Sequence, residues 1–391
     1  MNILAKNHKP ASARSVAAKN FLKKPLALAL TAVALSLAAA PSFAADWWTS
    51  MPATVTGRTT INVRTMGALG DGVHDDTAAF QAAVNALPAD GGTVYVGAGH
   101  YMINALKPIQ MRSHTRLLMA STATLEVIPN SASRYWLIKV WNVNNVRIVG
   151  GNLVGDRVKH MGTTGQWGYG INISGSQNVV VKQVKLSNFW GDGLLVGAIT
   201  TSRSQVLSDY VTVTGVVSSN NRRQGITIAP SSHVYIVGNT FKNSNGTLPE
   251  AGMDIEPQTE GPVTAVRVEN NVFSGNNGNG IELHANISDI TFVNNTLTGN
   301  RGFGALAISS EYLNFTGNNA NNNGLAGIGV SGTTHDVSIT GNTLKSNSTR
   351  YVSPGNTRTA LDRDLQLGAN TYNISVSGNY YSNPNLNGFT Q

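Results

Sequence analysis

The sequence predicts an all-β chain that forms a single-stranded parallel β-helix, a solenoid in which each coil stacks on the one before it. Three observations predict this fold: a strand pattern that recurs along the chain, a second strand series that interleaves with it, and a composition rich in turn residues. Only 12% of the 391 residues are charged, while glycine alone accounts for 41 of them. This composition suits short strands joined by many turns.

The first strand series is an alternating apolar segment that ends in Gly-Asn or Asn-Asn. Its copies begin at Val234, Val266, Ile290, Leu313, Val337 and Ile374, with weaker forms at Val146, Val179 and Val211. The successive spacings of the six clear copies are 32, 24, 23, 24 and 37 residues. A repeat of this size without helical spacing is typical of a solenoid. We expect the periodic asparagines to form hydrogen-bonded ladders between coils at the bends.

The second strand series opens with glycine and lies between copies of the first. Its members begin at Gly170, Gly193, Gly225, Gly252, Gly280, Gly304 and Gly327. Each turn of the chain therefore contributes at least two short strands. A β-sandwich would need hairpin turns and alternation without a fixed period, so the pattern favours the β-helix.

The first 44 residues have the pattern of an export signal. A basic start precedes an apolar run at residues 26–40, and Ser42, Phe43 and Ala44 form a small-x-small cleavage pattern. The apolar run is too short for a membrane span. We therefore expect a signal peptide at residues 1–44, cleaved near Ala44, and one β-helix domain without a membrane span at residues 45–391. The mature protein is expected to be periplasmic or secreted.

Removal of the signal changes the charge of the chain. The whole sequence has 28 basic and 20 acidic residues, a net charge of +8. The signal holds six basic residues and no acidic ones, so 28 − 6 leaves 22 against 20, or +2. This near balance gives no reason to expect a nucleic acid as partner. The absence of cysteine excludes a disulfide framework, a zinc site with cysteine ligands and a thiol nucleophile.

Two motifs open the mature chain. Residues 65–83 read TMGALGDGVHDDTAAFQAA, and residues 91–101 read GGTVYVGAGHY. Together they resemble the opening of the pectate-lyase-like superfamily, which includes polygalacturonase-type hydrolases, pectate and alginate lyases, alginate epimerases and phage tailspike depolymerases. The resemblance implies a right-handed parallel β-helix and a polysaccharide substrate.

We interpret this opening as structural. Asp75 or Asp76 is placed to cap a short helix from residue 77 to about residue 87. The apolar face of such a capping helix would close the N-terminal end of the core and prevent association of coils edge to edge. Residues 60–101 are therefore expected to form the N-terminal cap and the first coil.

Two adjacent glycine-opened strands carry ionisable groups at both outward positions. Residues 252–256 read Gly-Met-Asp-Ile-Glu, and residues 280–284 read Gly-Ile-Glu-Leu-His. Because side chains alternate between two faces, Asp254, Glu256, Glu282 and His284 are expected on one outer face. Neighbouring strands lie about 4.8 Å apart, and alternate residues of a strand about 6.6 Å apart, so the four groups fall within reach of one sugar ring.

These side chains suit glycoside hydrolysis. Neighbouring carboxyls oppose each other's ionisation, so one is expected to keep a proton while another stays ionised. Hydrolysis needs both forms, and the spacing of Asp254 and Glu256 is near the range of about 6.5 to 9.5 Å typical of inverting enzymes. The predicted catalytic residues are Asp254, Glu256, Glu282 and Asp192. Calcium is the competing use of such carboxylates, but the Gly-Gly-x-Gly-x-Asp calcium repeat is absent, so no cofactor is predicted.

Further residues are candidates for substrate binding. Arginine forks can hold a carboxylate or hydroxyl, aromatic rings can stack on sugars, and residues 151–170 form an insertion that could wall the groove. The candidates are His284, Arg222, Arg223, Trp167, Trp190, Tyr169, His160 and Lys159. The alternative interpretation is that the arginines are simply exposed, the aromatic residues belong to the core and Asp192 caps a turn.

Two other functions remain open. A lyase or C5-epimerase acting on a uronate polymer would need a cation and a base, for which Arg222, Arg223, His284 or Lys159 could serve. The Asp-Pro-His-Glu type of motif that alginate epimerases carry is absent, which counts against that branch. A carbohydrate-binding or adhesin-like β-helix without activity is the third possibility, since fold alone does not establish catalysis.

Overall fold

The computed structural model of the protein describes residues 46–49, 57–257, 261–351 and 363–382. The predicted signal peptide lies outside the described residues. Residues 46–391 group into one compact unit. Within the described ranges, no helix is long and apolar enough to span a membrane.

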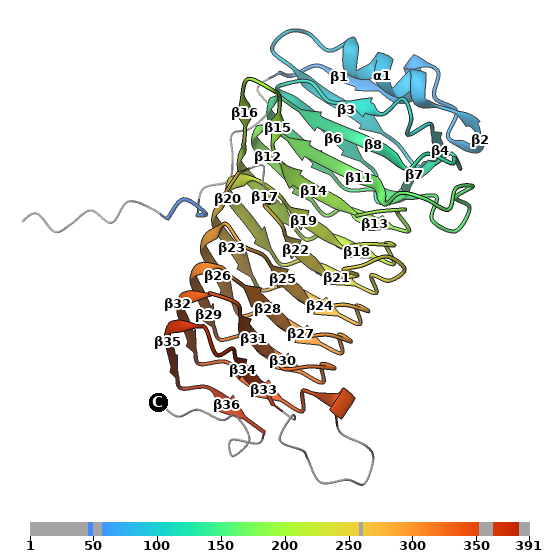
Figure 1. The fold of residues 1–391 in the computed structure, drawn as a ribbon. Helices are drawn as coiled ribbons and strands as arrows, with labels where there is room; N and C mark the ends of the chain where they lie inside the picture. Colours follow the sequence, from blue (N-terminus) through green and yellow to red (C-terminus); the bar gives the residue numbers. More distant parts are fainter. Residues whose placement is uncertain (1–45, 50–56, 258–260, 352–362, 383–391) are drawn as a thin grey trace, which may run out of the picture. The chain divides into compact units, whose positions relative to one another are not determined.

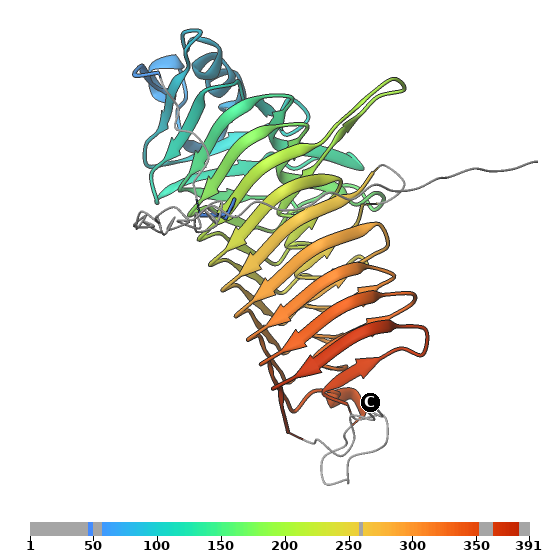
Figure 2. The same ribbon diagram turned by 90° about the vertical axis from the view of Figure 1, so that its left-hand side faces the viewer.

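The predicted fold class is confirmed, since the chain forms a right-handed parallel β-helix whose coils stack in sequence order (Figures 1 and 2). Each full coil contributes one strand to each of three parallel sheets, which we name sheets A, B and C. In the described part of the chain, sheets A and B have 12 strands each and sheet C has 10.

Sheet A contains the first predicted strand series. Its strands, in order, are β1 (Thr60–Asn62), β3 (Gly92–Val96), β6 (Thr115–Met119), β9 (Asn144–Val149), β12 (Gln177–Lys182), β17 (Ser208–Thr214), β20 (Ser231–Val237), β23 (Val263–Glu269), β26 (Ile287–Val293), β29 (Glu311–Thr316), β32 (His335–Thr340) and β35 (Tyr372–Ser377).

Sheet C contains the glycine-opened series. Its strands are β5 (Ile109–Gln110), β8 (Arg134–Trp141), β11 (Trp167–Ser174), β14 (Leu194–Gly197), β19 (Ile226–Ile228), β22 (Met253–Ile255), β25 (Ile281–Leu283), β28 (Ala305–Ile308), β31 (Ile328–Ser331) and β34 (Leu365–Leu367). An antiparallel hairpin of β15 (Ile199–Thr200) and β16 (Gln205–Val206) follows β14.

Sheet B was not anticipated as a separate series. Many of its strands are three residues long and bury only the middle side chain, as Phe241 does in β21, so they leave little periodic signal. The strands are β2 (Asp71–Asp75), β4 (Gly99–Ile103), β7 (Ala123–Val127), β10 (Asn152–Val154), β13 (Lys185–Ser187), β18 (Val217–Ser219), β21 (Thr240–Lys242), β24 (Val272–Ser274), β27 (Thr296–Thr298), β30 (Asn319–Asn321), β33 (Thr343–Lys345) and β36 (Tyr380–Tyr381).

Helical structure in the described residues is limited to α1 (Thr77–Asn85) and the short 3-10 helices η1 (Val63–Met66) and η3 (Thr349–Tyr351). Helix α1 ends about two residues earlier than predicted, and its Phe80 packs edge-on against Tyr101 at 5.3 Å. Asp76 occupies the N-cap position, but its side chain does not cap the helix. Its carboxylate instead accepts hydrogen bonds from the backbone of Leu69 and Gly70, which holds the preceding turn.

Stacked side chains hold the coils together from within. The predicted asparagine ladder is present, with amide-to-amide hydrogen bonds of 2.9 to 3.0 Å along Asn239, Asn271, Asn295, Asn318, Asn342 and Asn379. A second ladder, which the sequence pattern did not reveal, runs through Asn276, Asn300, Asn323, Asn347 and Asp364. Each ladder amide also donates to a backbone carbonyl of the preceding coil, as Asn271 Nδ2 does to Ile236 O at 2.9 Å. These buried bonds to both neighbouring coils fix the register of the stack.

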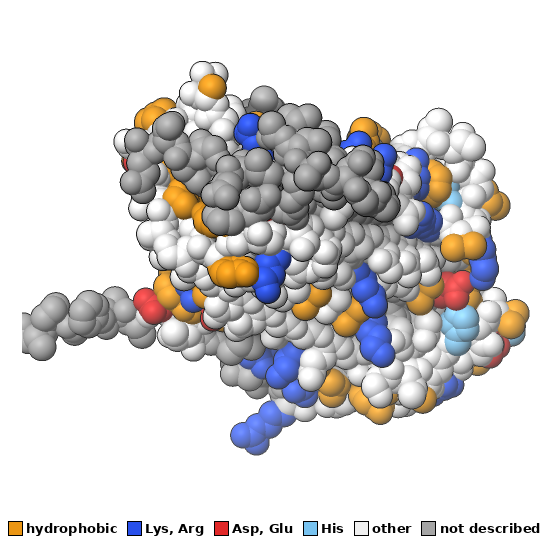
Figure 3. Space-filling model, turned by 90° about the horizontal axis from the view of Figure 1, so that it is seen from below, with side chains coloured by type: hydrophobic (Ala, Val, Ile, Leu, Met, Phe, Trp, Pro, Cys, Tyr) orange, Lys and Arg blue, Asp and Glu red, His pale blue; other side chains and the backbone are white. Residues whose placement is uncertain are grey.

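The outer surface carries few charges. On the face that Figure 3 shows, Lys and Arg side chains lie in small groups on a mostly uncharged surface, and Asp and Glu side chains are fewer. This arrangement matches the low charge content of the sequence. Sheet C has a place where several of these acids meet.

Candidate active site

The acid-bearing strands β22 and β25 lie side by side in sheet C (Figure 1). Asp254 pairs with Glu282, and on its other side Asp254 pairs with Thr227 of β19. Glu256 and His284 follow directly after these strands and continue the backbone pairing, with hydrogen bonds from their amides to the preceding coil of 2.9 and 3.1 Å. The register inferred from the glycines is therefore the register of the sheet.

His284 lies over Asp254. Its Nε2 atom is 3.1 Å from Asp254 Oδ1 and 3.6 Å from Glu282 Oε1. The Asp254 side chain is 1% exposed, whereas that of His284 is 39% exposed. No aligned hydrogen bond among the described residues reaches Asp254 Oδ1, so its contact with His284 is electrostatic. The exposed member of this pair is the imidazole.

The burial of Asp254 affects the protonation of both groups. Loss of solvent raises the pKa of Asp254 to about 7, against the opposing effect of His284. The contact with Asp254 raises the pKa of His284 in turn, although burial of the ring works against it. Together the two side chains keep a proton near neutral pH, a condition that suits a general acid.

Arg223 links two further carboxyls. Its NH1 atom is 3.2 Å from Asp192 Oδ2, and its NH2 atom donates to Glu256 Oε1. Burial raises the pKa of Asp192 to about 6, while Arg223 opposes the shift. Burial also disfavours the charge of Arg223, but Asp192 and Glu256 outweigh it and raise the pKa of the guanidinium. Glu256, 18% exposed, is the most exposed member of this cluster.

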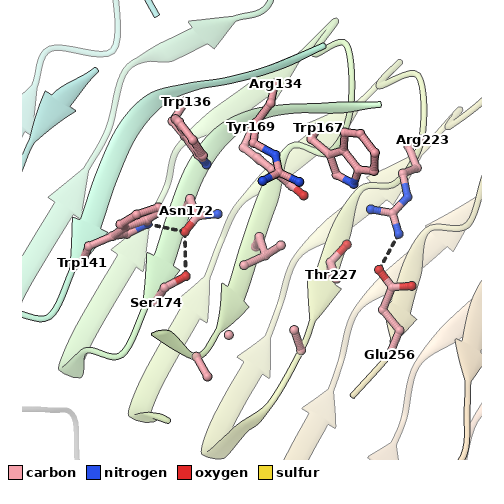
Figure 4. A pocket seen from close by; sticks show the side chains of 14 residues that line it. Arg134, Trp136, Trp141, Trp167, Tyr169, Asn172, Ser174, Arg223, Thr227 and Glu256 are labelled. Carbon is pink, nitrogen blue, oxygen red and sulfur yellow. Dashed lines mark hydrogen bonds and ion pairs between the residues drawn. The ribbon is translucent and has the colours of Figure 1, made fainter. Parts of the chain in front are cut away.

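A groove lined with aromatic side chains leads to Glu256 (Figure 4). We name it the aromatic groove; its volume is about 240 Å³. It is lined by Arg134, Trp136, Trp141, Trp167, Tyr169, Asn172, Ser174, Leu195, Gly197, Ala198, Arg223, Thr227, Ala229 and Glu256. It crosses the outer face of sheet C from β8 to the end of β22.

Cations accompany the rings of the aromatic groove. The Arg134 guanidinium lies 4.9 Å from the centre of the Trp167 ring, and Lys139 Nζ lies 3.4 Å from that of Trp141. The Trp141 Nε1 atom donates to Asn172 Oδ1 at 2.5 Å, which fixes the ring. Trp136, Trp141, Arg134 and Lys139 were missed by the sequence reasoning. The signal that could have found them is the series of outward positions 134, 136, 139 and 141, an alternation that is interrupted once by the buried pair Leu137 and Ile138.

A second pocket of about 370 Å³ borders Glu282. The Glu282 Oε2 atom accepts a hydrogen bond of 2.8 Å from Asn279 Nδ2. Arg301 and Arg350 also line this pocket. The acids of sheet C therefore lie between the aromatic groove and a second hollow that contains two cations.

Several predicted substrate-binding residues lie elsewhere. Trp190 is packed between the His160 ring, 4.0 Å away, and the Arg222 guanidinium, 3.8 Å away. Both faces of this indole are covered, so it offers no face to a sugar, contrary to our expectation. His160 is itself buried against Asp156 at 2.8 Å. The exposed Lys159 pairs with Glu126 at 2.9 Å and does not line the aromatic groove.

Two of the predicted catalytic acids are buried rather than exposed. Asp192 and Asp254 are outward of the core, but both are buried beneath other polar side chains. Neither can touch a bound polysaccharide in this conformation. Asp192 contacts Arg223, and Asp254 contacts His284. Glu256, Glu282 and His284 remain accessible.

The acids are not arranged around a common metal position. Among the described residues, no group of three or more His, Asp or Glu side chains could hold a metal ion. Asp192 and Glu256 converge on Arg223, and Asp254 on Gln224 and His284. The guanidinium and the imidazole supply the positive charge of this cluster.

Residues 60–352 match the family model of the rhamnogalacturonase A/epimerase, pectate lyase-like proteins. The chain belongs to this family. It is a family of polysaccharide-acting β-helix proteins. The match covers all the sheet C strands that form the site.

Curated relatives match only in part. The uncharacterized protein YclG of Bacillus subtilis is 30% identical over 267 residues, which is 59% of this chain and 46% of that protein. The mannuronan C5-epimerase AlgE5 of Azotobacter vinelandii is 61% identical over 44 residues, 11% of this chain and 4% of that protein. The chain thus spans less than half the length of these relatives.

Solved structures share the fold. The A-module of the Azotobacter vinelandii mannuronan C5-epimerase AlgE4 has a TM-score of 0.64 at 20% identity, over 83% of this chain and 95% of that chain. The ORF18 protein of Geobacillus virus E2 also has a TM-score of 0.64, at 15% identity, over 82% of this chain and 61% of that chain. At these identities the likeness establishes the fold alone.

Proposed function

We propose that the protein is an exported glycoside hydrolase that cuts a polysaccharide bound across sheet C. The observation that carries the proposal is the position of Glu256. This carboxylate is ion-paired with Arg223 at the end of the aromatic groove, two residues beyond Asp254 and one coil from His284. An ionised carboxylate beside a group that retains a proton is the combination that glycosidic hydrolysis requires.

Each accessible group has a role in this proposal. His284, held protonated by Asp254 and Glu282, gives its proton to the glycosidic oxygen as the bond to the leaving sugar breaks. Glu256 takes a proton from the water whose oxygen bonds to the anomeric carbon. Arg223 keeps Glu256 oriented, and Asp192 holds Arg223 from the buried side.

The aromatic groove supports an extended ligand. Four strand spacings separate β8 from β22, or about 19 Å at about 4.8 Å each. This is too long for one sugar ring, and flat rings along the way suit the apolar faces of sugars. The polymer is therefore proposed to lie along the stack, with Trp136 and Trp141 far from the bond that is cut.

Elimination or C5-epimerisation of a uronate polymer is the second candidate. The cations at Arg134, Lys139 and Arg223 support it, because a uronate carboxylate must be neutralised before its C5 proton can be removed. His284 would be the base in that reaction. The likeness to mannuronan C5-epimerases in residues and fold is consistent with it.

One experiment separates these functions. The purified mature protein is incubated with a panel of neutral and uronate polysaccharides. New reducing ends without ultraviolet-absorbing unsaturated ends indicate hydrolysis, unsaturated ends indicate elimination, and inverted C5 centres seen by NMR indicate epimerisation. Binding with none of these products would mean a non-catalytic carbohydrate-binding protein. Glu256→Gln is the inactive variant expected, and Glu311→Gln, at an exposed acid of sheet A, is the matched control.

A further inference from the structure

A chain of buried polar side chains joins Asp192 to Asp254. Gln224 Nε2 donates to Asp254 Oδ2. The Thr227 hydroxyl contacts Gln224 Oε1 and lies 2.8 Å from Asp192 Oδ2. Asp192, Gln224 and Asp254 are fully buried and Thr227 is 1% exposed. Because these four groups are buried, their polar contacts are with one another, with Arg223 at Asp192 and with His284 at Asp254.

The hydrogen bonds among these four side chains require one more proton than is present when Asp192 and Asp254 are both ionised. The Thr227 hydroxyl can donate one hydrogen bond only. Both of its neighbours, Gln224 Oε1 and Asp192 Oδ2, are acceptors when Asp192 is ionised. If Thr227 donates to Gln224, the contact with Asp192 requires a proton on Asp192.

The reverse arrangement moves that proton to the other acid. If Thr227 donates to Asp192, the Gln224 amide turns over so that its nitrogen donates to Thr227. The amide oxygen then faces Asp254 Oδ2, and this contact requires a proton on Asp254. An amide occupies nearly the same space in both orientations. The four groups carry the charge of one carboxylate in either case.

We propose that Asp192 and Asp254 hold one proton between them, coupled through the hydrogen bonds of Thr227 and Gln224, so that only one of these two acids behind His284 is ionised at a time. Gln224 and Thr227 are positioning residues in this relay. The part of the proposal that concerns His284 rests on its proposed role as the acid. The sharing of the proton does not depend on any substrate.

The charges around the two acids favour opposite ends of the relay. Asp192 faces Arg223, Glu256 and Tyr169, and the ion pair with Arg223 favours its ionised form. Asp254 faces His284, Glu256 and Glu282, and a protonated His284 favours an ionised Asp254. Burial raises the pKa of both acids, so that they titrate in the same range.

In this relay, Asp254 is ionised when His284 is protonated and becomes neutral when His284 is neutral. While the imidazole is protonated, the shared proton sits on Asp192 and Asp254 is ionised beneath the ring. When His284 has given its proton to the leaving oxygen, the second arrangement is favoured. Asp192 then loses its proton to solvent, Asp254 binds one from solvent and donates it in a hydrogen bond to the turned Gln224 amide, and Asp192 is left ionised against Arg223. No buried carboxylate is then left without a positive partner, a state that would be costly.

The test follows the titration of both acids by NMR in protein labelled with ¹³C at the aspartate carboxyls, with Asp192→Asn and Asp254→Asn used to assign the signals. In the wild type, both signals are expected to show two-step curves. Asp192→Asn should lower the Asp254 midpoint by roughly one unit, since coupled sites interact by about that much. In a Thr227→Val background, Asp192→Asn should shift the Asp254 midpoint much less.

Two further variants make the result decisive. Thr227→Ser keeps the hydroxyl and should restore the wild-type coupling, which a mere packing role for Thr227 would not predict. Thr227→Val alone should turn both two-step curves into independent one-step curves. If Asp192→Asn shifts the Asp254 midpoint equally in the wild-type and Thr227→Val backgrounds, the acids interact only through space. That result would overturn the relay. If coupling is seen but no polysaccharide is cleaved, the proposed function fails and the relay stands.

Discussion

The imidazole of His284 covers Asp254, with Nε2 of the ring 3.1 Å from Oδ1 of the buried carboxyl. Through this contact the buried Asp254, which no polysaccharide can touch, raises the pKa of the exposed His284. It also separates the site into an accessible layer of His284, Glu256 and Glu282 and a buried layer of Asp254 and Asp192. The predictions below distinguish the two layers.

In the accessible layer, Glu256→Gln is expected to lower kcat by about 10² to 10⁴, the usual contribution of a general base, with little change in KM. The amide keeps the shape of the side chain and leaves Arg223 paired with Asp192, so the fold should persist. Initial rates on the active polysaccharide and circular dichroism check this. Equal rates for Glu256→Gln and Glu311→Gln would remove Glu256 from the mechanism.

In the buried layer, Asp254 should make the protein less stable as pH rises. Its pKa is raised from 3.8 to about 7, so the folded state binds a proton that the unfolded state has released. The stability contributed by this proton is complete below pH 3.8 and lost as pH rises through about 7. The raised pKa of His284 acts in the same direction from pH 6.5 upward.

Asp254→Asn removes this dependence. The free energy of unfolding of the wild type minus that of the variant should decline between pH 4 and pH 8, by a few kcal/mol at most, because one pKa unit corresponds to about 1.4 kcal/mol. Urea unfolding at a series of pH values measures it. A difference that is constant with pH would show that Asp254 titrates at an ordinary value.

At a pH above the pKa values of His284 and Asp192, where His284 is neutral and Asp192 is ionised, Arg223→Met should destabilise the fold by about 3 to 5 kcal/mol, because it leaves the buried Asp192 without its cation. The second change Asp192→Asn should recover much of this loss, since the unpaired charge is then gone. Denaturant unfolding of the two single variants and the double variant gives the coupling energy. If the losses in free energy of unfolding from the two single substitutions simply add in the double variant, the ion pair between Arg223 and Asp192 does not contribute to stability.

At the far end of the aromatic groove, Trp141→Ala should weaken the binding of long substrates about tenfold, which corresponds to about 1.4 kcal/mol. Oligosaccharides too short to reach β8 from Glu256 should be cut at the wild-type rate. Calorimetry with the Glu256→Gln variant measures binding without turnover. Tyr312→Ala, at an exposed aromatic of sheet A, is the control and should bind normally. Equal losses on long and short substrates would mean that Trp141 is not a distant binding position.

Much of the fold followed from the periodicity of the chain. The asparagine ladder, the two principal strand series and the pairing of Asp254 with Glu282 are all consequences of alternation and fixed spacing. Sheet B escaped because many of its strands are three residues long, bury only the middle side chain and leave no alternating run, and the second ladder follows these short strands. Of the two predicted capping residues, Asp76 does not cap the helix, because its carboxylate binds a turn that precedes it, a contact that local spacing does not specify. Asp75 Oδ1 instead accepts a hydrogen bond of 2.9 Å from the backbone amide of Thr77, the first residue of α1.

The sequence by itself determined which residues face outward from the coils, because side-chain alternation and the glycine register are local properties that a strand stack preserves. Only the tertiary structure decided which of those residues reach solvent. Asp192 and Asp254 are covered by Arg223, Gln224 and His284, whose side chains come from other coils or lean across them. Burial and charge pairing depend on these three-dimensional neighbours, so the protonation of the acids, and hence their division of labour, is a property of the stack.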